Sequence, residues 1–223
     1  MIFFDLDDTL LDHDAAARAG VVRFYETFRS HFDMDFETFL ARWIMLAEKY
    51  FQSNSVVQYT LSEQHRIRMR NLFSETLTNE EADARFKIYL DTYQLNWKLH
   101  PDAIPCLQAF QGRPMGLITN GDGKQQRAKI KKFGLGAYLS TVVISLEVGC
   151  AKPDKAIFEL AAQQGGARIG DCVYVGDRLE TDALGSLCAG MKGIWLDRKG
   201  KGVGKEIEVP VIKSLMELPQ LLR

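Results

Sequence analysis

The sequence lacks the features that mark a membrane, zinc or disulfide-stabilised protein. No run of apolar residues approaches the roughly 18 that a membrane-spanning helix needs. The four cysteines form no CxxC pair, and the four histidines show no HxH or HxxxH spacing, which disfavours a zinc site. Asp5 and Asp7 stand where a signal peptide would need an apolar stretch, so we expect a soluble cytoplasmic protein.

The sequence also lacks an excess of charge of one sign. The chain carries 28 Lys and Arg against 29 Asp and Glu, so it has no overall positive field that would attract polyanions such as nucleic acid. With 223 residues, 46% of them hydrophobic and only 6 prolines, it is long enough for one large domain or a core with a smaller second domain. A chain of this length buries roughly 70% of its unfolded surface and needs no disulfide to fold.

Short apolar runs that end in Gly, Asn, Asp or Ser alternate with helix-like stretches. The expected strands are Ile2–Phe4, Met115–Ile118, Val142–Ile144, Val173–Val175 and Gly193–Leu196. The expected helices between the later strands are Lys124–Phe133, Lys155–Gln164 and Asp182–Ala189. Continuous apolar runs suit strands that are buried on both faces of a parallel sheet. The pattern therefore predicts an α/β fold with a doubly wound, Rossmann-like parallel sheet.

Residues 13–96 show a different pattern of apolar residues. Aromatic and aliphatic residues recur there at helical spacing, and no strand-like run interrupts them. A connection of this length is too long for a structureless loop. We predict an all-helical domain over residues 13–96, inserted after the first strand, with residues 1–12 and 97–223 forming the α/β core. We interpret its aromatic stripes as the interior of that domain.

Polar residues follow several of the predicted strands. Carboxyl ends of parallel strands meet at one edge of a sheet, where ligands bind. The residues in question are Asp5, Asp7, Thr9, Thr119, Asn120, Lys152, Asp177 and Asp182. Helix capping would explain Asp154 or Asp182, but it explains poorly a lone lysine beside the pair Asp5 and Asp7. We therefore predict a functional site at this edge.

A basic helix lies between the second and third strands. It carries Lys124, Arg127, Lys129, Lys131 and Lys132. A run of this kind is more often a solvated helix face than a binding patch, and we predict a solvated face.

The residues at the strand ends resemble the motifs of the haloacid dehalogenase-like hydrolases. Asp5-Leu-Asp-Asp-Thr-Leu10 is similar to their first motif, DxDxT, and Thr119 ends a strand as in the second. Lys152-Pro-Asp is similar to the third motif, and Gly176-Asp-Arg-Leu-Glu-Thr-Asp182 to the fourth, GDxxxxD. The motifs occur in order over the whole core, and the family places a helical cap where the helical insertion begins. The resemblance implies a phosphatase of this family, in the branch of pyrimidine 5′-nucleotidases and acylneuraminate 9-phosphatases.

Three carboxylates in one small site require a cation, and hard oxygen ligands favour Mg²⁺. We assign Asp5 and Asp177 as metal ligands, and the resemblance implies that the backbone carbonyl of Asp7 joins them. Asp182 is expected to orient a metal-bound water or Lys152 instead of binding the metal directly.

The same residues suggest a two-step phosphate transfer. Asp5 is the expected nucleophile, and its attack on phosphorus gives an aspartyl-phosphate that water then cleaves. Asp7 is expected to protonate the leaving alcohol and later to accept a proton from water. The phosphoryl oxygens should be held by Thr119, Lys152 and N–H groups near Asn120. Thr9 is expected to orient the loop that carries Asp7, and strand alternation places Asp8 away from the site.

Other functions stay open at this stage. A 2-haloacid dehalogenase would not need Asp7, the phosphomutase relatives resemble DxDGV, and a silent binding module would be expected to lack a motif residue. The expected partner is a small phosphorylated metabolite, with a nucleoside 5′-monophosphate as the first choice and a sugar or acylated-sugar phosphate as the alternative. Candidate contacts in the helical insertion are Arg42, Trp43, Tyr50 and Gln52. We expect a monomer or a weak homodimer, and neither nucleic acid nor a membrane as partner.

Overall fold

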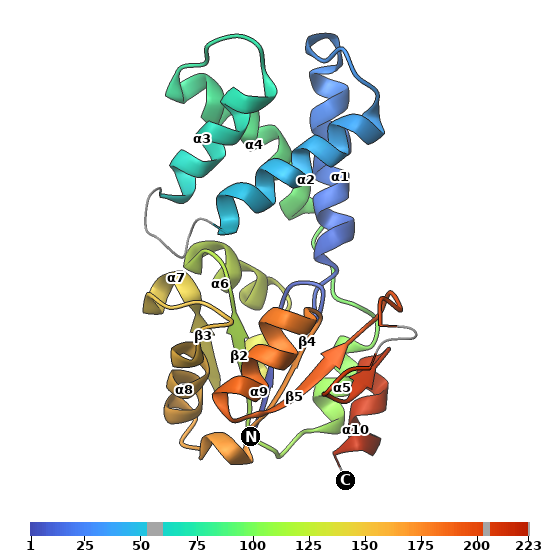
Figure 1. Ribbon diagram of the computed structural model, residues 1–223, viewed down its shortest axis with the longest axis vertical. Coiled ribbons are helices and arrows are strands. Elements are labelled where there is room, and N and C mark those ends of the chain that lie inside the picture. The colour runs from blue at the N-terminus through green and yellow to red at the C-terminus, as the bar shows by residue number, and fades with distance from the viewer. Residues whose placement is uncertain (53–59, 203–205, 223) are drawn as a thin grey trace. The chain divides into compact units, whose positions relative to one another are not determined.

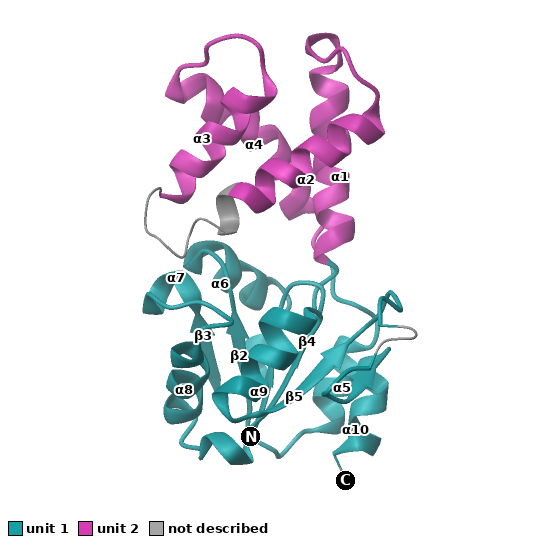
Figure 2. Ribbon diagram, viewed as in Figure 1, with its two compact units in different colours: residues 1–12, 98–223 teal, residues 13–97 magenta. Residues whose placement is uncertain are grey.

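The structure is a computed structural model that describes residues 1–52, 60–202 and 206–222, with only the backbone described for residues 50–52. It divides into two compact units (Figure 2): unit 1 comprises Met1–Asp12 and Lys98–Arg223, and unit 2 comprises His13–Trp97. Unit 2 extends one residue beyond the predicted insertion, because the Trp97 ring packs edge-on against Tyr93 at a centroid distance of 5.6 Å. No helix in the described part of the chain combines the length and apolar character needed to cross a membrane.

Unit 1 is built on a parallel sheet, as the sequence predicts, and this sheet has six strands (Figure 1). The strands are β1 (Ile2–Phe4), β2 (Met115–Thr119), β3 (Thr141–Ile144), β4 (Val173–Gly176), β5 (Lys192–Leu196) and β6 (Val211–Ile212). Their order in the sheet is β3-β2-β1-β4-β5-β6. The first five match the predicted apolar runs, and those runs are almost entirely buried. The edge strand β6 has only two residues, which is too short for a pattern to reveal.

The helices of unit 1 follow the strands along the chain. They are α5 (Ala103–Ala109), α6 (Gly123–Lys132), α7 (Ser145–Val148), α8 (Lys155–Gln164), α9 (Gly185–Ala189) and α10 (Leu218–Leu221). Single turns of 3-10 helix occur at Leu135–Ala137, Ile169–Asp171 and Leu215–Glu217, and a π-helical turn at Leu179–Leu184. α8 packs on β2, β3 and α9, and Phe158 with Ile118 belongs to the core between helix and sheet. This core holds the strands rigidly beneath the polar residues at their ends.

Unit 2 is helical throughout its regular elements. They are α1 (His13–Thr27), a 3-10 turn at Arg29–His31, α2 (Phe36–Gln52), α3 (Leu61–Leu72) and α4 (Asn79–Leu95). Thr60 and Thr78 begin α3 and α4 as capping boxes, in which the threonine and a glutamate three residues later satisfy each other's backbone N–H groups. These local signals fix where the two helices start.

The aromatic stripes of unit 2 form its interior. Trp43 is only 4% exposed and packs between Phe24 and Tyr89, at centroid distances of 5.1 and 4.8 Å. In the same helix Ile44 is 48% exposed, whereas Leu46 is buried. The aromatic residues therefore stabilise the helical unit by packing against one another.

Candidate active site

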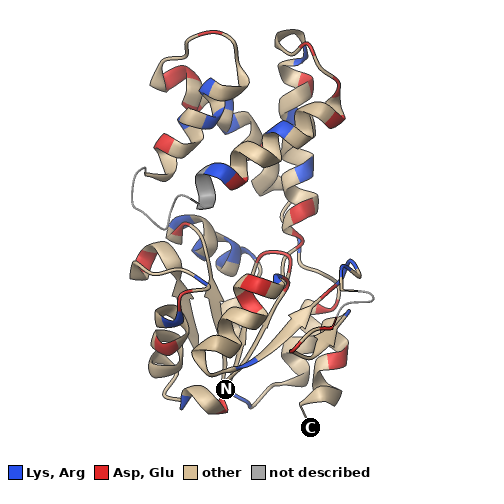
Figure 3. Ribbon diagram, in the orientation of Figure 1, with Lys and Arg blue, Asp and Glu red and all other residues tan. Residues whose placement is uncertain are grey.

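Three neighbouring strands bring the predicted polar residues to one edge of the sheet. β1 lies between β2 and β4, with Phe4 opposite Leu117 and Val175. The chain therefore leaves β1 at Asp5 beside the ends of the other two strands. Carboxylate oxygens of Asp5, Asp177 and Asp182 lie within 4.8 Å of one another. Figure 3 shows acidic residues on the loop after β1 and on the turn after β4.

Lys152 lies at the centre of this group. Its Nζ donates to Asp5 Oδ1 at 2.6 Å, to Asp182 Oδ1 at 2.7 Å and to the Tyr174 hydroxyl at 2.6 Å. An ammonium has three protons, so these contacts use all of its donors. Burial alone would lower the pKa of Lys152, but the charges of Asp182 and Asp5 outweigh it and raise that pKa. Lys152 is thus a buried, fully engaged cation.

The backbone of Lys152 is held by Asn120. The Asn120 side chain accepts from the Lys152 backbone N–H at 2.9 Å and donates to the Lys152 carbonyl at 2.9 Å. We predicted a substrate contact near Asn120. The structure shows that its side-chain amide is occupied with positioning the lysine, which leaves its backbone N–H for that purpose.

Tyr174 is a member of the site that the sequence did not reveal. Its hydroxyl accepts from Lys152 and donates to the Ile118 carbonyl at 2.9 Å, so it ties the lysine to the neighbouring strand β2. Burial and the nearby carboxylates raise the pKa of Tyr174 well above its usual value, which keeps the hydroxyl protonated. A tyrosine within an otherwise apolar strand was the sequence feature that could have indicated this role.

Capping was one explanation for Asp182, but it does not account for the contact of its carboxylate with Lys152. Asp154 does cap α8, by accepting from the Ala156 N–H at 2.9 Å. Asp182 instead accepts from Lys152 with one oxygen and from the Arg178 backbone N–H with the other, at 3.0 Å. A Cβ at position 176 would come within 2.4 Å of its carboxylate, so Gly176 is required for this approach.

The cluster around Asp5 carries more negative than positive charge. Burial, together with the charge of Asp182 and against the opposing effect of Lys152, raises the pKa of Asp5 to about 7. Burial and the charges of Asp5, Asp182 and Asp8 raise the pKa of Asp177 to about 8. The Asp177 carboxylate accepts no hydrogen bond from any described residue. Three carboxylates facing one ammonium form a buried group of hard oxygen ligands that could hold a divalent cation such as Mg²⁺.

Asp7 lies in different surroundings from Asp5. Lys129 Nζ donates to its two carboxylate oxygens at 2.7 and 2.9 Å, and Gln126 Nε2 donates to Oδ2 at 2.9 Å. Lys129 is fully buried, whereas Lys124 and Lys131 on the same helix are exposed. Our prediction that the basic helix is a solvated face is therefore wrong for Lys129. Gln126 and Lys129 lie three residues apart, on the inward face of α6, and that polar inward face was the missed signal.

For the loop after β1, one expectation stays a prediction and one needs correction. Thr9 was expected to orient the Asp7 loop; its hydroxyl donates to Asp5 Oδ2 at 3.4 Å, and its carbonyl accepts from Arg198 at 2.9 Å. Asp8 was placed away from the site by strand alternation. The strand has ended by then, and Asp8 adopts a left-handed φ of 62°, so alternation does not apply. Its charge is instead one of the causes that raise the pKa of Asp177.

Among the candidate contacts in the helical insertion, Trp43 is in the aromatic core described above. The Arg42 guanidinium donates to the Asn71 carbonyl, and the side chains of Tyr50 and Gln52 are outside the described residues.

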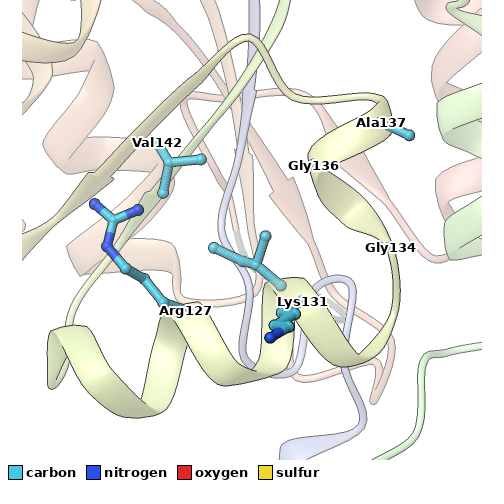
Figure 4. Close-up of a pocket in the computed structure, with 7 residues that line it drawn as sticks. Arg127, Lys131, Gly134, Gly136, Ala137 and Val142 are labelled. Carbon is cyan, nitrogen blue, oxygen red and sulfur yellow. The ribbon is translucent and has the colours of Figure 1, made fainter.

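A cavity of about 400 Å³ opens elsewhere on unit 1, beside α6 (Figure 4). Its lining residues are Arg127, Ile130, Lys131, Gly134, Gly136, Ala137 and Val142. None of the strand-end residues contributes to it, and its lining contains no carboxylate, thiol or imidazole. The strand-end cluster is therefore the better candidate for chemistry.

Comparisons with known proteins identify relatives over nearly the whole chain. The haloacid dehalogenase-like hydrolase family matches residues 1–190. The chain is 30% identical to N-acylneuraminate-9-phosphatase of Homo sapiens, over 100% of this chain and 93% of that protein. It is 32% identical to pyrimidine 5′-nucleotidase YjjG of Escherichia coli strain K12, over 99% and 96%. The HAD-hydrolase YfnB of Bacillus subtilis, crystallised with magnesium, has a similar fold, with a TM-score of 0.78 at 20% identity over 100% and 97% of the two chains.

Proposed function

The chain belongs to the haloacid dehalogenase-like hydrolases and is a phosphatase of small phosphorylated metabolites, and from this premise we propose that it is a Mg²⁺-dependent phosphomonoester hydrolase that works through an aspartyl-phosphate on Asp5. The observation that carries the proposal is the charge surplus around Asp5. Three carboxylates share this cluster, and Lys152 is the single described cation in contact with them. Such a cluster is suited to a divalent cation and to the phosphate that the cation brings with it.

Asp5, Asp177 and the backbone carbonyl of Asp7 would hold the Mg²⁺, whose charge would reduce the repulsion between the Asp5 carboxylate and the phosphate. In the first step an Asp5 oxygen forms a bond to phosphorus while the bond from phosphorus to the substrate oxygen breaks. Asp7 gives its proton to that oxygen, so the product leaves as an alcohol. In the second step water attacks the same phosphorus, Asp7 accepts the water proton, and Asp5 is released with inorganic phosphate.

Thr119 and Lys152 would hold the phosphoryl oxygens during both steps, together with backbone N–H groups near Asn120. The Lys152 donors are already engaged with Asp5, Asp182 and Tyr174. A phosphoryl oxygen can therefore bind Lys152 only by taking the place of one of these acceptors. The Asp5 contact is the natural one to be exchanged, because Asp5 itself becomes bonded to phosphorus.

The remainder of the substrate has two candidates. A nucleoside 5′-monophosphate was our first choice, because a base can stack on an aromatic side chain. Trp43, the described aromatic candidate for that role, is buried in the core of unit 2. This removes Trp43 from that role, and we favour an acylated-sugar phosphate, the class named for the relative from Homo sapiens.

Steady-state kinetics with and without Mg²⁺ test the proposal. The substrates are an acylated-sugar phosphate, a set of hexose phosphates, UMP, dUMP, AMP and a 2-haloacid. We expect phosphate release that stops when EDTA removes the metal, and a kcat/KM for the acylated-sugar phosphate at least tenfold above that for the nucleotides, which is about 1.4 kcal/mol of transition-state preference. Nucleotides as the better substrates would reverse the substrate choice only. Halide release from the 2-haloacid without metal, and no phosphate release, would overturn the phosphatase mechanism itself.

A further inference from the structure

The inward face of α6 carries two polar side chains where a helix that packs on a sheet normally carries apolar ones. Gln126 is 1% exposed, and Lys129 is fully buried. Burying an ammonium costs several kcal/mol unless a partner of opposite charge compensates. A buried lysine on this face is therefore expected to contact a carboxylate. Both side chains point to the same residue, Asp7, which lies 119 and 122 positions earlier in the chain.

Lys129 contacts both oxygens of the Asp7 carboxylate, at 2.7 and 2.9 Å. One donor that bridges two oxygens fixes the plane of a carboxylate as well as its position. Gln126 adds a second donor on Oδ2, at 2.9 Å. The loop that carries Asp7 also has backbone hydrogen bonds, from Asp8 N–H to the Leu11 carbonyl and from Leu11 N–H to the Leu6 carbonyl, which fix the backbone and not the Asp7 carboxylate. The orientation of the Asp7 side chain therefore depends on α6.

Gln126 also connects Asp7 to the second strand. Its Nε2 donates to Thr119 Oγ1 at 2.8 Å and lies 3.3 Å from the Asn120 carbonyl. One amide group therefore contacts the residue expected to move the proton and the residue expected to hold a phosphoryl oxygen. Its Oε1 is buried without a hydrogen-bond partner among the described residues. An unsatisfied buried oxygen is costly, and its presence indicates that the amide is placed for its donors.

We propose that Gln126 and Lys129 are positioning residues for the reaction: they hold the Asp7 carboxylate in the place and orientation from which it exchanges a proton with the substrate oxygen. The inference rests on the proposed function of Asp7 as the acid and base of the phosphatase. Neither residue is assigned any contact with the phosphoryl group or with the metal. We therefore expect Lys129 to act on catalysis through Asp7, and Gln126 to act through Asp7 and Thr119.

This assignment predicts a particular kinetic pattern. Proton transfer is sensitive to placement, and a displacement of about 1 Å can cost about a hundredfold in rate. A misplaced Asp7 should matter most when the leaving alcohol needs a proton, as with an alkyl phosphate, and least with p-nitrophenyl phosphate, whose phenolate leaves without one. KM should change little when Lys129 is replaced, because the groups that bind phosphate are untouched.

The test compares Lys129→Met with Lys131→Met, an exposed lysine two residues further along the same helix. We expect Lys129→Met to lower kcat/KM for an alkyl phosphate by about ten- to a hundredfold and to lower kcat/KM for p-nitrophenyl phosphate by less than about threefold. Lys131→Met should leave both values unchanged. Gln126→Leu is a second variant that removes the donors while Lys129 stays, and it should show a smaller loss of the same kind. Thermal melting establishes that each variant is folded.

Combining each change with Asp7→Asn separates the inference from the proposed function. If Lys129 acts through Asp7, then Lys129→Met should cause no further loss of kcat/KM in an Asp7→Asn enzyme. Equal losses in the two backgrounds, or equal losses on both substrates, would overturn the positioning role and leave the function of Asp7 intact. An Asp7→Asn enzyme that retains full activity on the alkyl phosphate would instead overturn the role of Asp7 in the proposed function.

Discussion

Asp5 and Asp7 are two residues apart in the sequence and lie in opposite electrostatic surroundings. Asp5 shares a buried cluster with the carboxylates of Asp177 and Asp182, against the ammonium of Lys152. Asp7 faces Lys129, whose ammonium contacts both of its oxygens, and the neutral amide of Gln126. One region has unbalanced negative charge, and the other is an ion pair with an added neutral donor.

The difference separates two kinds of chemistry that a phosphatase needs. An excess of carboxylates favours binding a metal ion and, through it, a phosphate. A carboxylate held on both oxygens by side chains from a neighbouring helix has a fixed orientation, which suits a proton donor or acceptor. The comparison therefore supports Asp5 as the group that reacts with phosphorus and Asp7 as the group that moves the proton.

The largest effect is expected from Asp5→Asn. The amide cannot attack phosphorus and adds no negative charge for the cation, so turnover should fall below about 1% of the unmodified enzyme. Lys152 keeps Asp182 and Tyr174 as acceptors, and the fold should persist in thermal melting. Asp154→Asn, at an exposed helix cap, is the matched control and should retain full activity. Activity of Asp5→Asn above that level would remove Asp5 from the nucleophile role.

Asp7→Asn should cause a smaller and more selective loss. We expect kcat/KM to fall about a hundredfold for an alkyl phosphate and much less for p-nitrophenyl phosphate, because the nitrophenolate leaves without a proton. The two substrates are measured side by side under identical Mg²⁺ concentrations. A loss of the same size on both substrates would mean that Asp7 does not act as the acid.

The charge surplus around Asp5 predicts a pH dependence of stability in the metal-free protein. The pKa of Asp5 is raised to about 7 and that of Asp177 to about 8, from 3.8. The folded state then binds more protons than the unfolded state between about pH 4 and pH 8, so the free energy of unfolding should decrease as the pH rises through this range. We expect a decrease of about 2 kcal/mol or more in urea unfolding with EDTA present.

Millimolar Mg²⁺ should restore the lost stability at pH 8 and have little effect at pH 5, where protons already neutralise the cluster. Asp177→Asn should flatten the dependence, because it removes one of the two raised groups. A metal-free protein that becomes more stable between pH 4 and pH 8 would contradict the charge surplus on which the comparison rests.

The smallest effect is expected from Tyr174→Phe, which keeps the ring and removes the hydroxyl that supports Lys152. The Ile118 carbonyl would lose a donor at 2.9 Å, and Lys152 would lose one of three acceptors. We expect a loss of about 1–2 kcal/mol in the free energy of unfolding and a rate decrease of less than about tenfold. Tyr138→Phe, which removes a hydroxyl outside this cluster, should change neither. A hundredfold loss of rate would place the Tyr174 hydroxyl in the reaction.

The group of residues around Asp5 could largely be predicted from the sequence, but the side chains that contact Asp7 could not. Asp5, Thr119 and Asp177 come at the ends of apolar runs, and a parallel sheet brings such ends together. Lys129 and Gln126 reach Asp7 only because of the way α6 is turned toward the sheet, and a run of lysines does not reveal which of them faces inward. Asp8 itself adopts a left-handed backbone conformation after the strand has ended, where strand alternation gives no guidance.

The central claim is that Asp5 becomes covalently bonded to phosphorus, and the most direct measurement is to trap that intermediate. Asp7→Asn lacks the base that activates water, so the aspartyl-phosphate should accumulate during turnover of p-nitrophenyl phosphate with Mg²⁺. Borohydride added after an acid quench reduces an aspartyl-phosphate to homoserine, which peptide mass spectrometry can locate. We expect homoserine at position 5 in Asp7→Asn and none in the double variant with Asp5→Asn. Homoserine at another aspartate, or continued turnover with no modified residue, would contradict the account.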